Sequence, residues 1–288
     1  MKRLLAVLLA VCFVATMFTA CGEGSGNNSS GGDTEVVNIA DYAGIWKISQ
    51  GEVDTVKIDA ENSTVTAYAE NGIEIATFAA VATADGLVLK MGALGNITLE
   101  DPASLTVTAL PQNAAPSIAG DWTIIWGNFP DGTALHVKED GTFTNTGAYE
   151  DSGTYTTEGS EYYFSSTHEL VGLVTHVVTG GGAILQATNP SSSHRVYVRD
   201  DSTNTDTGKA IYNYYYLSAN SWSSPEDSAL TVEFKENGKM FVSGMETGIW
   251  YPTADGATVE YTDQTTENLS VVDGTISISY IGKSVSKE

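Results

Sequence analysis

Histidine side chains are the first groups in this chain to consider for metal or acid–base chemistry. His168-Glu169 begins like the zinc pattern His-Glu-x-x-His, but Gly172 stands where the second histidine belongs. That pattern also needs a helix, whereas residues 170–178 read as a strand. His176 lies among Val and Thr residues and is expected to be partly buried, while His136 is expected to face solvent. We therefore predict no metal site and no catalytic histidine.

Other sequence patterns for chemistry are equally weak. Gly180-Gly181-Gly182 lies between two expected strands, and no helix follows it to form a phosphate site. No Gly-x-Ser-x-Gly nucleophile elbow occurs. The oxygen-rich segment 200–208 could hold calcium, but its spacing differs from an EF-hand loop and favours a polar linker. Carboxylates are numerous, so the sequence leaves open that two of them, distant in the chain, form a catalytic pair like that of glycosidases. No cofactor is predicted.

Aromatic residues provide the candidates for ligand binding. Trp126 and Phe129 flank Gly127-Asn128 in what is expected to be the first loop of a β unit. They could stack on a sugar, close over an apolar ligand, or fold back as a lid on the core. In an extended chain, Tyr212, Tyr214 and Tyr216 would share one face, which suits either a core or a binding surface. The ligand-binding candidates are Trp126, Phe129 and Tyr214.

The elements that must position these residues are β-strands. Apolar and polar residues alternate in segments such as 195–199, 230–234 and 275–280. Asp-Gly or Asn-Gly pairs separate such runs and favour tight hairpins, because these residues tolerate positive φ. They occur at residues 85–86, 140–141, 237–238, 255–256 and 273–274. An all-β body of antiparallel meanders is predicted, without a long helix beyond the N-terminal apolar run.

An internal triplication organises the predicted strands. Trp46, Trp122 and Trp222 each open a unit, and a turn begins 15, 18 and 15 residues later. A glycine then opens another strand 10, 12 and 10 residues after the turn, and a further hairpin follows in each unit. Three tandem small β-barrels or sandwiches are predicted. Their ranges are 39–110, 116–200 and 209–288, with linkers at 111–117 and 200–209.

A Gly-x-Trp that opens an up-and-down meander resembles the calycin group, which includes lipocalin-like domains of bacterial lipoproteins. Gly44-Ile45-Trp46 and Gly120-Asp121-Trp122 carry this motif, and the third unit lacks the glycine. The resemblance implies that each Trp packs across one end of a barrel. A Trp there also buries about 150–250 Å² and can plug an open end. Trp46, Trp122 and Trp222 are therefore expected to be structural.

The N-terminus has the features of an export signal. Lys2 and Arg3 precede an uncharged apolar run that is too short to cross a bilayer comfortably. Its end, Phe18-Thr19-Ala20-Cys21, resembles the lipobox of bacterial lipoproteins. The resemblance implies cleavage after residues 1–20 and a diacylglyceryl group on Cys21. The alternative is an ordinary secretory signal with an incidental cysteine. Residues 21–38, rich in Gly, Ser and Asn, are expected to be a flexible tether.

Charge and cysteine content restrict the partners. Removal of residues 1–20 takes away two of 13 basic residues and none of 36 acidic ones, which leaves a net charge of −25. This charge argues against binding to nucleic acid and against adhesion to an anionic membrane through a basic patch. The other cysteine, Cys12, lies in the apolar run, so the mature chain could form no internal disulfide.

Two classes of function follow from these patterns. The first is a lipid-anchored, non-catalytic binding module outside the cytoplasm, on the cell membrane or outer membrane. Its partner would be a small apolar ligand, a glycan or an envelope protein. The second is an extracytoplasmic hydrolase with a dispersed carboxylate site. Because paired His or Cys chemistry is nearly absent, the sequence favours the first.

Overall fold

A computed structural model describes residues 36–110, 116–127, 133–147, 150–167, 173–188 and 194–287. The predicted signal segment, Cys21 and Phe129 lie outside these ranges. None of the helices in the described part of the chain combines the length and apolar character required to span a bilayer.

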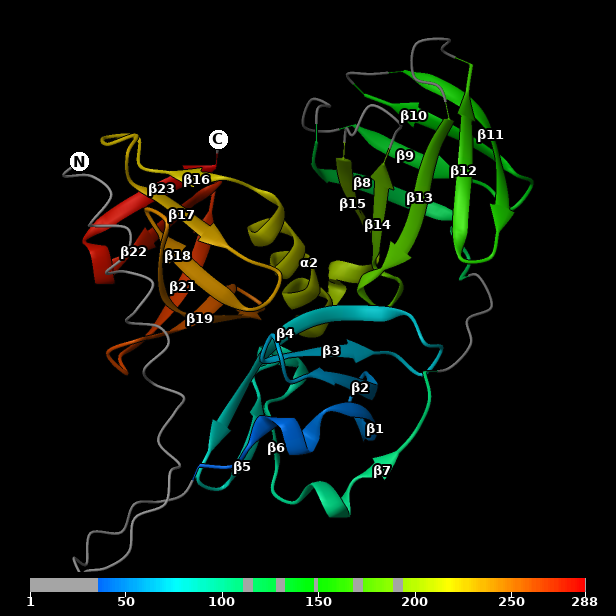
Figure 1. The fold of residues 1–288 in the computed structure, drawn as a ribbon. Coiled ribbons are helices and arrows are strands. Elements are labelled where there is room, and N and C mark those ends of the chain that lie inside the picture. The colour runs from blue at the N-terminus through cyan, green and yellow to red at the C-terminus, as the bar shows by residue number, and fades with distance from the viewer. Residues whose placement is uncertain are drawn as a thin grey trace, which may run out of the picture. The chain divides into compact units, whose positions relative to one another are not determined.

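Three antiparallel sheets follow one another along the chain, which confirms the all-β prediction (Figure 1). We call them the first (β1–β7), second (β8–β15) and third (β16–β23) repeats. The first forms an open seven-stranded sheet in the order β6-β5-β4-β3-β2-β1-β7. The second and third close into eight-stranded barrels, β8 to β15 and β16 to β23.

The strands of the first repeat are β1 (Gly44–Gln50), β2 (Val53–Asp59), β3 (Thr64–Tyr68), β4 (Glu74–Thr83), β5 (Gly86–Leu89), β6 (Ile97–Leu99) and β7 (Thr106–Val107). Those of the second are β8 (Gly120–Trp126), β9 (Ala134–Val137), β10 (Thr142–Thr146), β11 (Asp151–Glu158), β12 (Glu161–Ser166), β13 (Leu173–Thr179), β14 (Ile184–Thr188) and β15 (His194–Arg199). Those of the third are β16 (Trp222–Ser223), β17 (Thr231–Phe234), β18 (Lys239–Val242), β19 (Met245–Thr253), β20 (Gly256–Tyr261), β21 (Thr266–Val272), β22 (Thr275–Ile278) and β23 (Lys283–Lys287).

The hairpins form where the dipeptides predict them. All five Asp-Gly or Asn-Gly pairs lie between or at the ends of consecutive paired strands. Asp273 and Gly274 have φ angles of 49° and 69° between β21 and β22. Two positive φ angles in succession match the twist of the flanking strands, and Asp and Gly accept them at low cost.

The helices lie between and within the sheets. The one α-helix of the described ranges is α2 (Asp206–Ala219). Short 3₁₀ turns are η1 (Ile39–Tyr42), η2 (Gly92–Leu94), η3 (Pro102–Ser104), η4 (Gly180–Gly182), η5 (Ser202–Asn204) and η6 (Ser279–Ile281).

Helix α2 corrects the expectation of an extended tyrosine ladder. Thr205 caps the helix by accepting a hydrogen bond from the Gly208 N–H at 3.0 Å. Tyr212 and Tyr216 lie one turn apart and stack with their ring centroids 5.5 Å apart, whereas Tyr214 is buried on another face. The tyrosine run therefore divides between two environments instead of forming one face.

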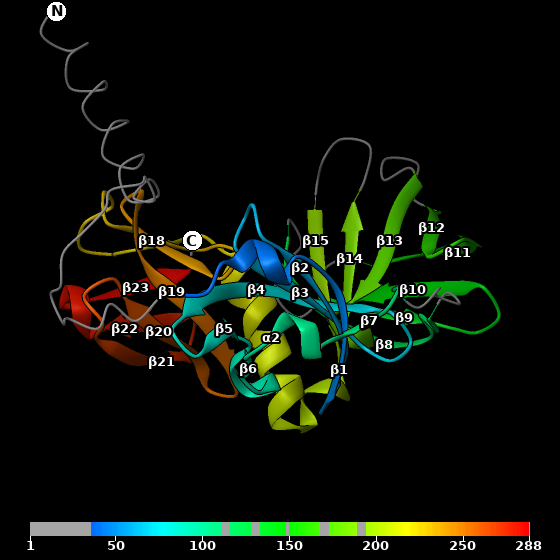
Figure 2. The same cartoon turned by 60° about the horizontal axis from the view of Figure 1, so that its bottom comes forward.

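The three repeats meet around α2, which contacts β4, β15 and β19 (Figures 1 and 2). The Tyr215 hydroxyl donates to the Ile75 carbonyl oxygen at 2.9 Å and lies 2.9 Å from the Thr179 hydroxyl. Tyr214 Oη lies 3.0 Å from the Thr77 carbonyl oxygen. Tyr214 and Tyr215 therefore connect α2 to the first repeat by hydrogen bonds, and Tyr215 also connects it to the second repeat.

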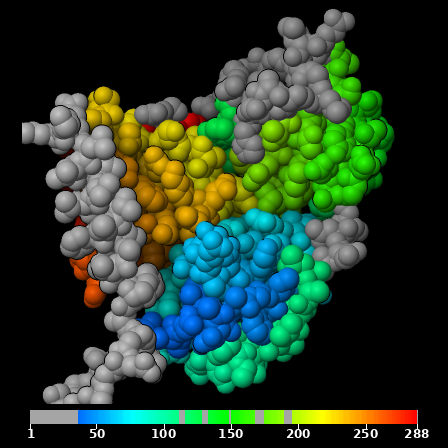
Figure 3. All heavy atoms as spheres, in the orientation of Figure 1, coloured from blue at the N-terminus to red at the C-terminus, as the bar shows by residue number. Residues whose placement is uncertain are grey.

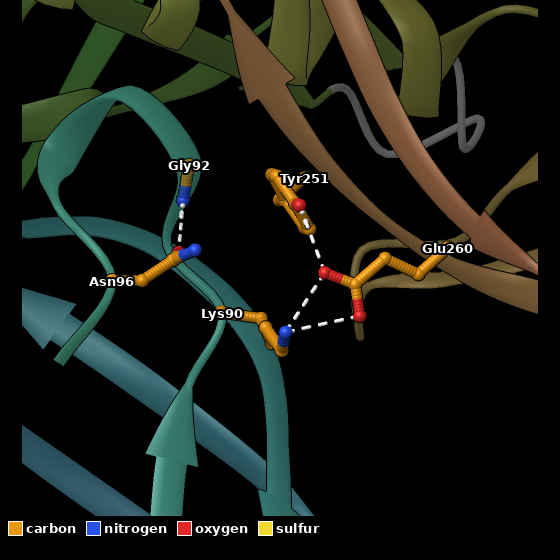
Figure 4. Close-up of polar contacts among 5 residues, drawn as sticks. All are labelled: Lys90, Gly92, Asn96, Tyr251 and Glu260. Carbon is orange, nitrogen blue, oxygen red and sulfur yellow. Dashed lines mark hydrogen bonds and ion pairs between the residues drawn. The ribbon is translucent and has the colours of Figure 1, made fainter. Parts of the chain in front are cut away.

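A direct contact joins the first and third repeats (Figure 3). Lys90 Nζ lies 2.8 and 3.0 Å from the two carboxylate oxygens of Glu260, which also accepts a hydrogen bond from Tyr251 at 2.9 Å (Figure 4). Nearby, a Cβ on Gly92 would lie 2.3 Å from the Pro252 carbonyl oxygen. The backbones approach so closely here that only glycine fits.

Buried apolar residues form two clusters. The larger one runs through the first and third repeats, α2 and the outer side of β8, β14 and β15. The smaller one fills the inside of the second barrel. The second barrel therefore has a core of its own, whereas the other two repeats share one.

Candidate functional site

The three tryptophan landmarks occupy equivalent places. Each is buried at or near the start of the first strand of its repeat. The indole N–H donates to a backbone carbonyl oxygen four or five residues earlier, at 2.7, 3.0 and 3.0 Å. The acceptors belong to Tyr42, Ile118 and Leu217 for Trp46, Trp122 and Trp222. The same hydrogen bond therefore recurs in all three units.

The residue opposite each Trp on the closing strand differs. Trp46 pairs with Val107, Trp122 with Arg199 and Trp222 with Lys287. The Arg199 guanidinium carbon lies 4.4 Å from the Trp122 ring centroid. Its nitrogens donate to the carbonyl oxygens of Ser117, Ala119 and Gly182. Trp122 and Arg199 therefore pack on each other where β8 and β15 pair.

The ligand-binding candidates of the sequence do not surround a common cavity. Trp126 is the last residue of β8 instead of a loop residue, and its half-buried side chain packs against the larger core. Tyr214 is only 3% exposed. Phe129 lies outside the described residues. Neither Trp126 nor Tyr214 lines any of the cavities considered below.

The interior of the second barrel is almost filled. Its cavity measures about 20 Å³, which is room for about one water molecule. Phe143, Phe164 and His176 pack across it, with centroids 4.6 Å apart for the first pair and 3.9 Å for the second. Burial lowers the pKa of His176 to about 3, and the Arg195 charge acts in the same direction. His176 is therefore a neutral core residue, and this lumen leaves no space for a carried ligand.

The third barrel is filled by aromatic side chains. Trp222, Phe234 and Trp250 are each no more than 2% exposed. They meet edge to face, with centroid separations of 6.4 Å and 5.3 Å along this series. The buried core of the third barrel therefore includes a continuous series of aromatic rings.

One surface set has the connectivity of a catalytic triad. His136 Nδ1 lies 2.7 Å from Asp121 Oδ1, and His136 Nε2 lies 3.0 Å from the Thr146 hydroxyl. The three side chains come from β8, β9 and β10 on the outside of the second barrel. His136 is 37% exposed and Asp121 64% exposed, and none of the three lines a described cavity. Catalysis of acyl transfer also needs a substrate site and oxyanion donors, which these residues do not themselves provide.

A pocket of about 590 Å³ lies where the second repeat, α2 and the third repeat meet. We call it the junction pocket. Its size falls within the usual range for small-molecule sites. It is lined by Thr123, Val198, Asp200, Thr203, Lys209, Tyr212, Asn213, Ala254, Asp255 and Val271.

Asn213 gives the junction pocket a fixed acceptor. Its side-chain nitrogen donates to the carbonyl oxygens of Thr253 and Ala254, at 2.8 and 3.1 Å. Because carbonyl oxygens only accept, these bonds determine which end of the amide is nitrogen. Asn213 is 6% exposed, and its Oδ1 makes no hydrogen bond within the described residues. Asn213 therefore lines the pocket with an amide that its two donated bonds hold in place, and its oxygen is left to accept a further hydrogen bond.

Charged and aromatic groups complete the junction pocket. Asp200 accepts a hydrogen bond from the Thr123 hydroxyl at 2.7 Å, while the Asp255 side chain makes none within the described ranges. Lys209 is the one cation of the lining and lies 3.4 Å from Asp206. Tyr212 contributes a half-buried ring. The lining can accept several hydrogen bonds and carries more negative than positive charge.

Sequence reasoning missed the residues of this pocket, apart from Tyr212 in the tyrosine run. Asp200, Thr203 and Lys209 lie in or beside the predicted linker. Asp255 belongs to a turn dipeptide and Asn213 separates two tyrosines. The sequence gives no sign that these residues share a pocket, because they come together only when separate repeats pack.

No group of three or more His, Cys, Asp or Glu side chains within the described ranges could hold a metal ion. Comparisons of the chain with protein-family models, curated proteins and solved structures find no match in any of the three.

Proposed function

We propose that this chain is an exported, lipid-anchored binding protein that takes a small ligand in the junction pocket and performs no catalysis. The pocket, lined by an Asn213 amide whose oxygen accepts no hydrogen bond from the described chain, is the observation that carries the ligand site. Because the two donated bonds hold the Asn213 amide in place, a ligand donor can bind its oxygen with little loss of side-chain freedom. The nearly filled barrel interiors support an outer site in place of a carrier lumen.

The proposed lipid anchor rests on the sequence of residues 18–21, which resembles a lipobox. Cys21→Ser should abolish incorporation of labelled fatty acid and leave the protein unprocessed or released from the membrane fraction. A Cys21→Ser protein that is cut at the same position and stays membrane-bound would contradict the anchor.

The ligand site can be tested with a broad small-molecule screen by ligand-observed NMR. We expect hits that compete with one another and are lost when Thr203→Trp fills the junction pocket. Ser279→Trp, in a separate cavity of the third repeat, is the matched control and should retain binding. Hits that survive Thr203→Trp, or a screen without any hit, would refute the proposed site.

The alternative is an extracytoplasmic hydrolase. The Asp121–His136–Thr146 set is the specific observation in its favour. If the hydrolase alternative is right, the purified protein hydrolyses an ester or a glycoside. His136→Gln then abolishes this activity while the melting temperature stays the same. Under the binding proposal, neither the native protein nor His136→Gln hydrolyses such substrates.

A further inference from the structure

We infer that the junction pocket binds a neutral or amino-bearing saccharide, and this inference rests on the ligand site proposed above. The argument uses the hydrogen-bonding capacity, the charge and the ring surface of the pocket. Each of these properties favours one chemical class and disfavours others.

The polar groups of the junction pocket are mainly acceptors. Asn213, whose oxygen accepts no hydrogen bond within the described residues, lines it together with Asp200 and Asp255. Their natural complement is a ligand with several donors held on a rigid frame. A saccharide ring provides this, since each hydroxyl can donate one hydrogen bond and accept others. An apolar ligand would desolvate these acceptors without replacing their hydrogen bonds, which is unfavourable.

The charge of the lining argues against an anionic ligand. Asp200 and Asp255 share the lining with a single cation, Lys209, which already lies 3.4 Å from Asp206. Phosphate or carboxylate groups are normally held by clustered cations or by bidentate arginine. An acidic sugar or a nucleotide would therefore be repelled. An amino group on the ligand would instead gain an interaction with either carboxylate.

The tyrosine ring offers an apolar platform for the ring carbons. Tyr212 lines the pocket, and its ring is backed by Tyr216 at an interplanar angle of 12°. Lys287 Nζ lies 5.4 Å from the centroid of the Tyr216 ring. This backing fixes the orientation of Tyr212, so little side-chain freedom is lost when a ligand packs on it. The apolar side chains of Val198 and Val271 add further contact area.

Isothermal titration and saturation-transfer NMR on the full soluble body can test the ligand class. The probes are cello-oligosaccharides as neutral ligands, chitosan oligomers as amino-bearing ligands and oligogalacturonates as acidic ones. We expect the neutral and amino-bearing probes to bind and the acidic probe not to bind. Acidic oligomers that bind as tightly as the neutral ones, or no saccharide binding at all, would overturn the inference.

Variants locate the binding. Tyr212→Ala and Asp255→Asn should each weaken saccharide binding by about tenfold or more, because each removes a central contact. The Asp255 side chain makes no hydrogen bond within the described residues, so Asp255→Asn should leave the melting temperature unchanged. Tyr280→Ala removes a 42% exposed tyrosine elsewhere on the third repeat and should not affect binding. Equal binding by Asp255→Asn and the native protein would contradict the inferred contacts.

The two proposals fail in different ways. If the pocket binds only non-saccharide compounds from the broad screen, and Thr203→Trp abolishes that binding, the binding function stands and the saccharide inference is wrong. If saccharides bind but Thr203→Trp has no effect, both the junction site and the inference are wrong.

Discussion

Lys90 and Glu260 lie 170 positions apart in the sequence and form a two-point ion pair between the first and third repeats. Their side chains are 17% and 32% exposed, so solvent screens the pair only in part. Lys90→Met, Glu260→Gln and the double variant form a mutant cycle. We expect a coupling of about 1 kcal/mol in the free energy of unfolding from urea titrations. A coupling of zero would show that the pair does not join the repeats energetically.

The Glu260 carboxylate should also affect the ionisation of Tyr251. Burial, the hydrogen bond to Glu260 and the Glu260 charge together raise the pKa of Tyr251 to about 12. Glu260→Gln removes the carboxylate charge and leaves only a neutral acceptor for the hydroxyl, so the pKa of Tyr251 should fall toward its ordinary value. The ultraviolet absorbance of tyrosinate during alkaline titration measures this change. Glu246→Gln, a third-repeat variant away from Tyr251, should leave the titration as it is, and an unchanged midpoint in Glu260→Gln would contradict the assignment.

The strands and hairpins could be predicted from the sequence because their signals are local. Alternation decides which side chains face inward, and a pair such as Asp273-Gly274 determines a tight turn by its own φ preferences. The tryptophan spacing revealed the repeats for a similar reason. Each of these tryptophans occupies the equivalent buried position in its own repeat, so their spacing marks the repeats.

Helix α2 could not be predicted as easily, because its signals conflict. Tyr and Asn are only moderate helix formers, and Tyr212, Tyr214 and Tyr216 also alternate as a strand would. Thr205 as cap and the burial of Ile211 and Leu217 on the packed side favour the helix. The junction pocket was beyond prediction, since it exists only after residues from two repeats and α2 have packed together.

Tyr215 should contribute to stability mainly through its hydroxyl. The hydroxyl donates to the Ile75 carbonyl oxygen and lies within hydrogen-bond distance of Thr179. Tyr215→Phe keeps the ring but leaves these buried groups with one partner fewer, at a cost of about 1–3 kcal/mol. Chemical unfolding measures the loss. Tyr280→Phe is the control, because Tyr280 is 42% exposed and its variant should unfold like the native protein.

His176 should make the second barrel sensitive to acid. Its pKa is about 3 in the folded state against 6.5 as the ordinary value, so the unfolded chain takes up the proton first. Its contribution to stability is therefore fully present above pH 6.5 and is lost as the pH falls toward 3. The slope of this loss is about 1.4 kcal/mol per pH unit.

The variant His176→Phe isolates this effect from the many carboxylates, which titrate in both proteins. Phe can keep the stacking on Phe164 and cannot take up a proton. The difference in unfolding free energy between the native protein and the variant should be constant above pH 7 and change steadily below pH 6. A difference that stays constant down to pH 4 would mean that His176 becomes protonated within the folded barrel.

Trp122 and Trp126 lie four residues apart on β8 and should differ in their effect on stability. Trp122 is 0% exposed, donates to the Ile118 carbonyl oxygen and packs against the Arg199 guanidinium. Trp122→Ala should leave a cavity and cost about 3–5 kcal/mol. Trp126 is half-buried on the outer side, against the larger core. Its replacement by Ala should cost about half as much, since less apolar area is lost.

Thermal and urea unfolding of the full body, followed by tryptophan fluorescence and circular dichroism, would measure both variants. Trp122→Phe serves as a control, because it keeps most of the ring volume and loses the N–H. It should fall between the native protein and Trp122→Ala. Equal losses for the two Ala variants would mean that the contacts of Trp126 outside the second barrel stabilise the protein as much as the buried Trp122 does. A Trp122→Ala protein as stable as the native one would show that the recurring tryptophan does not close the barrel at all.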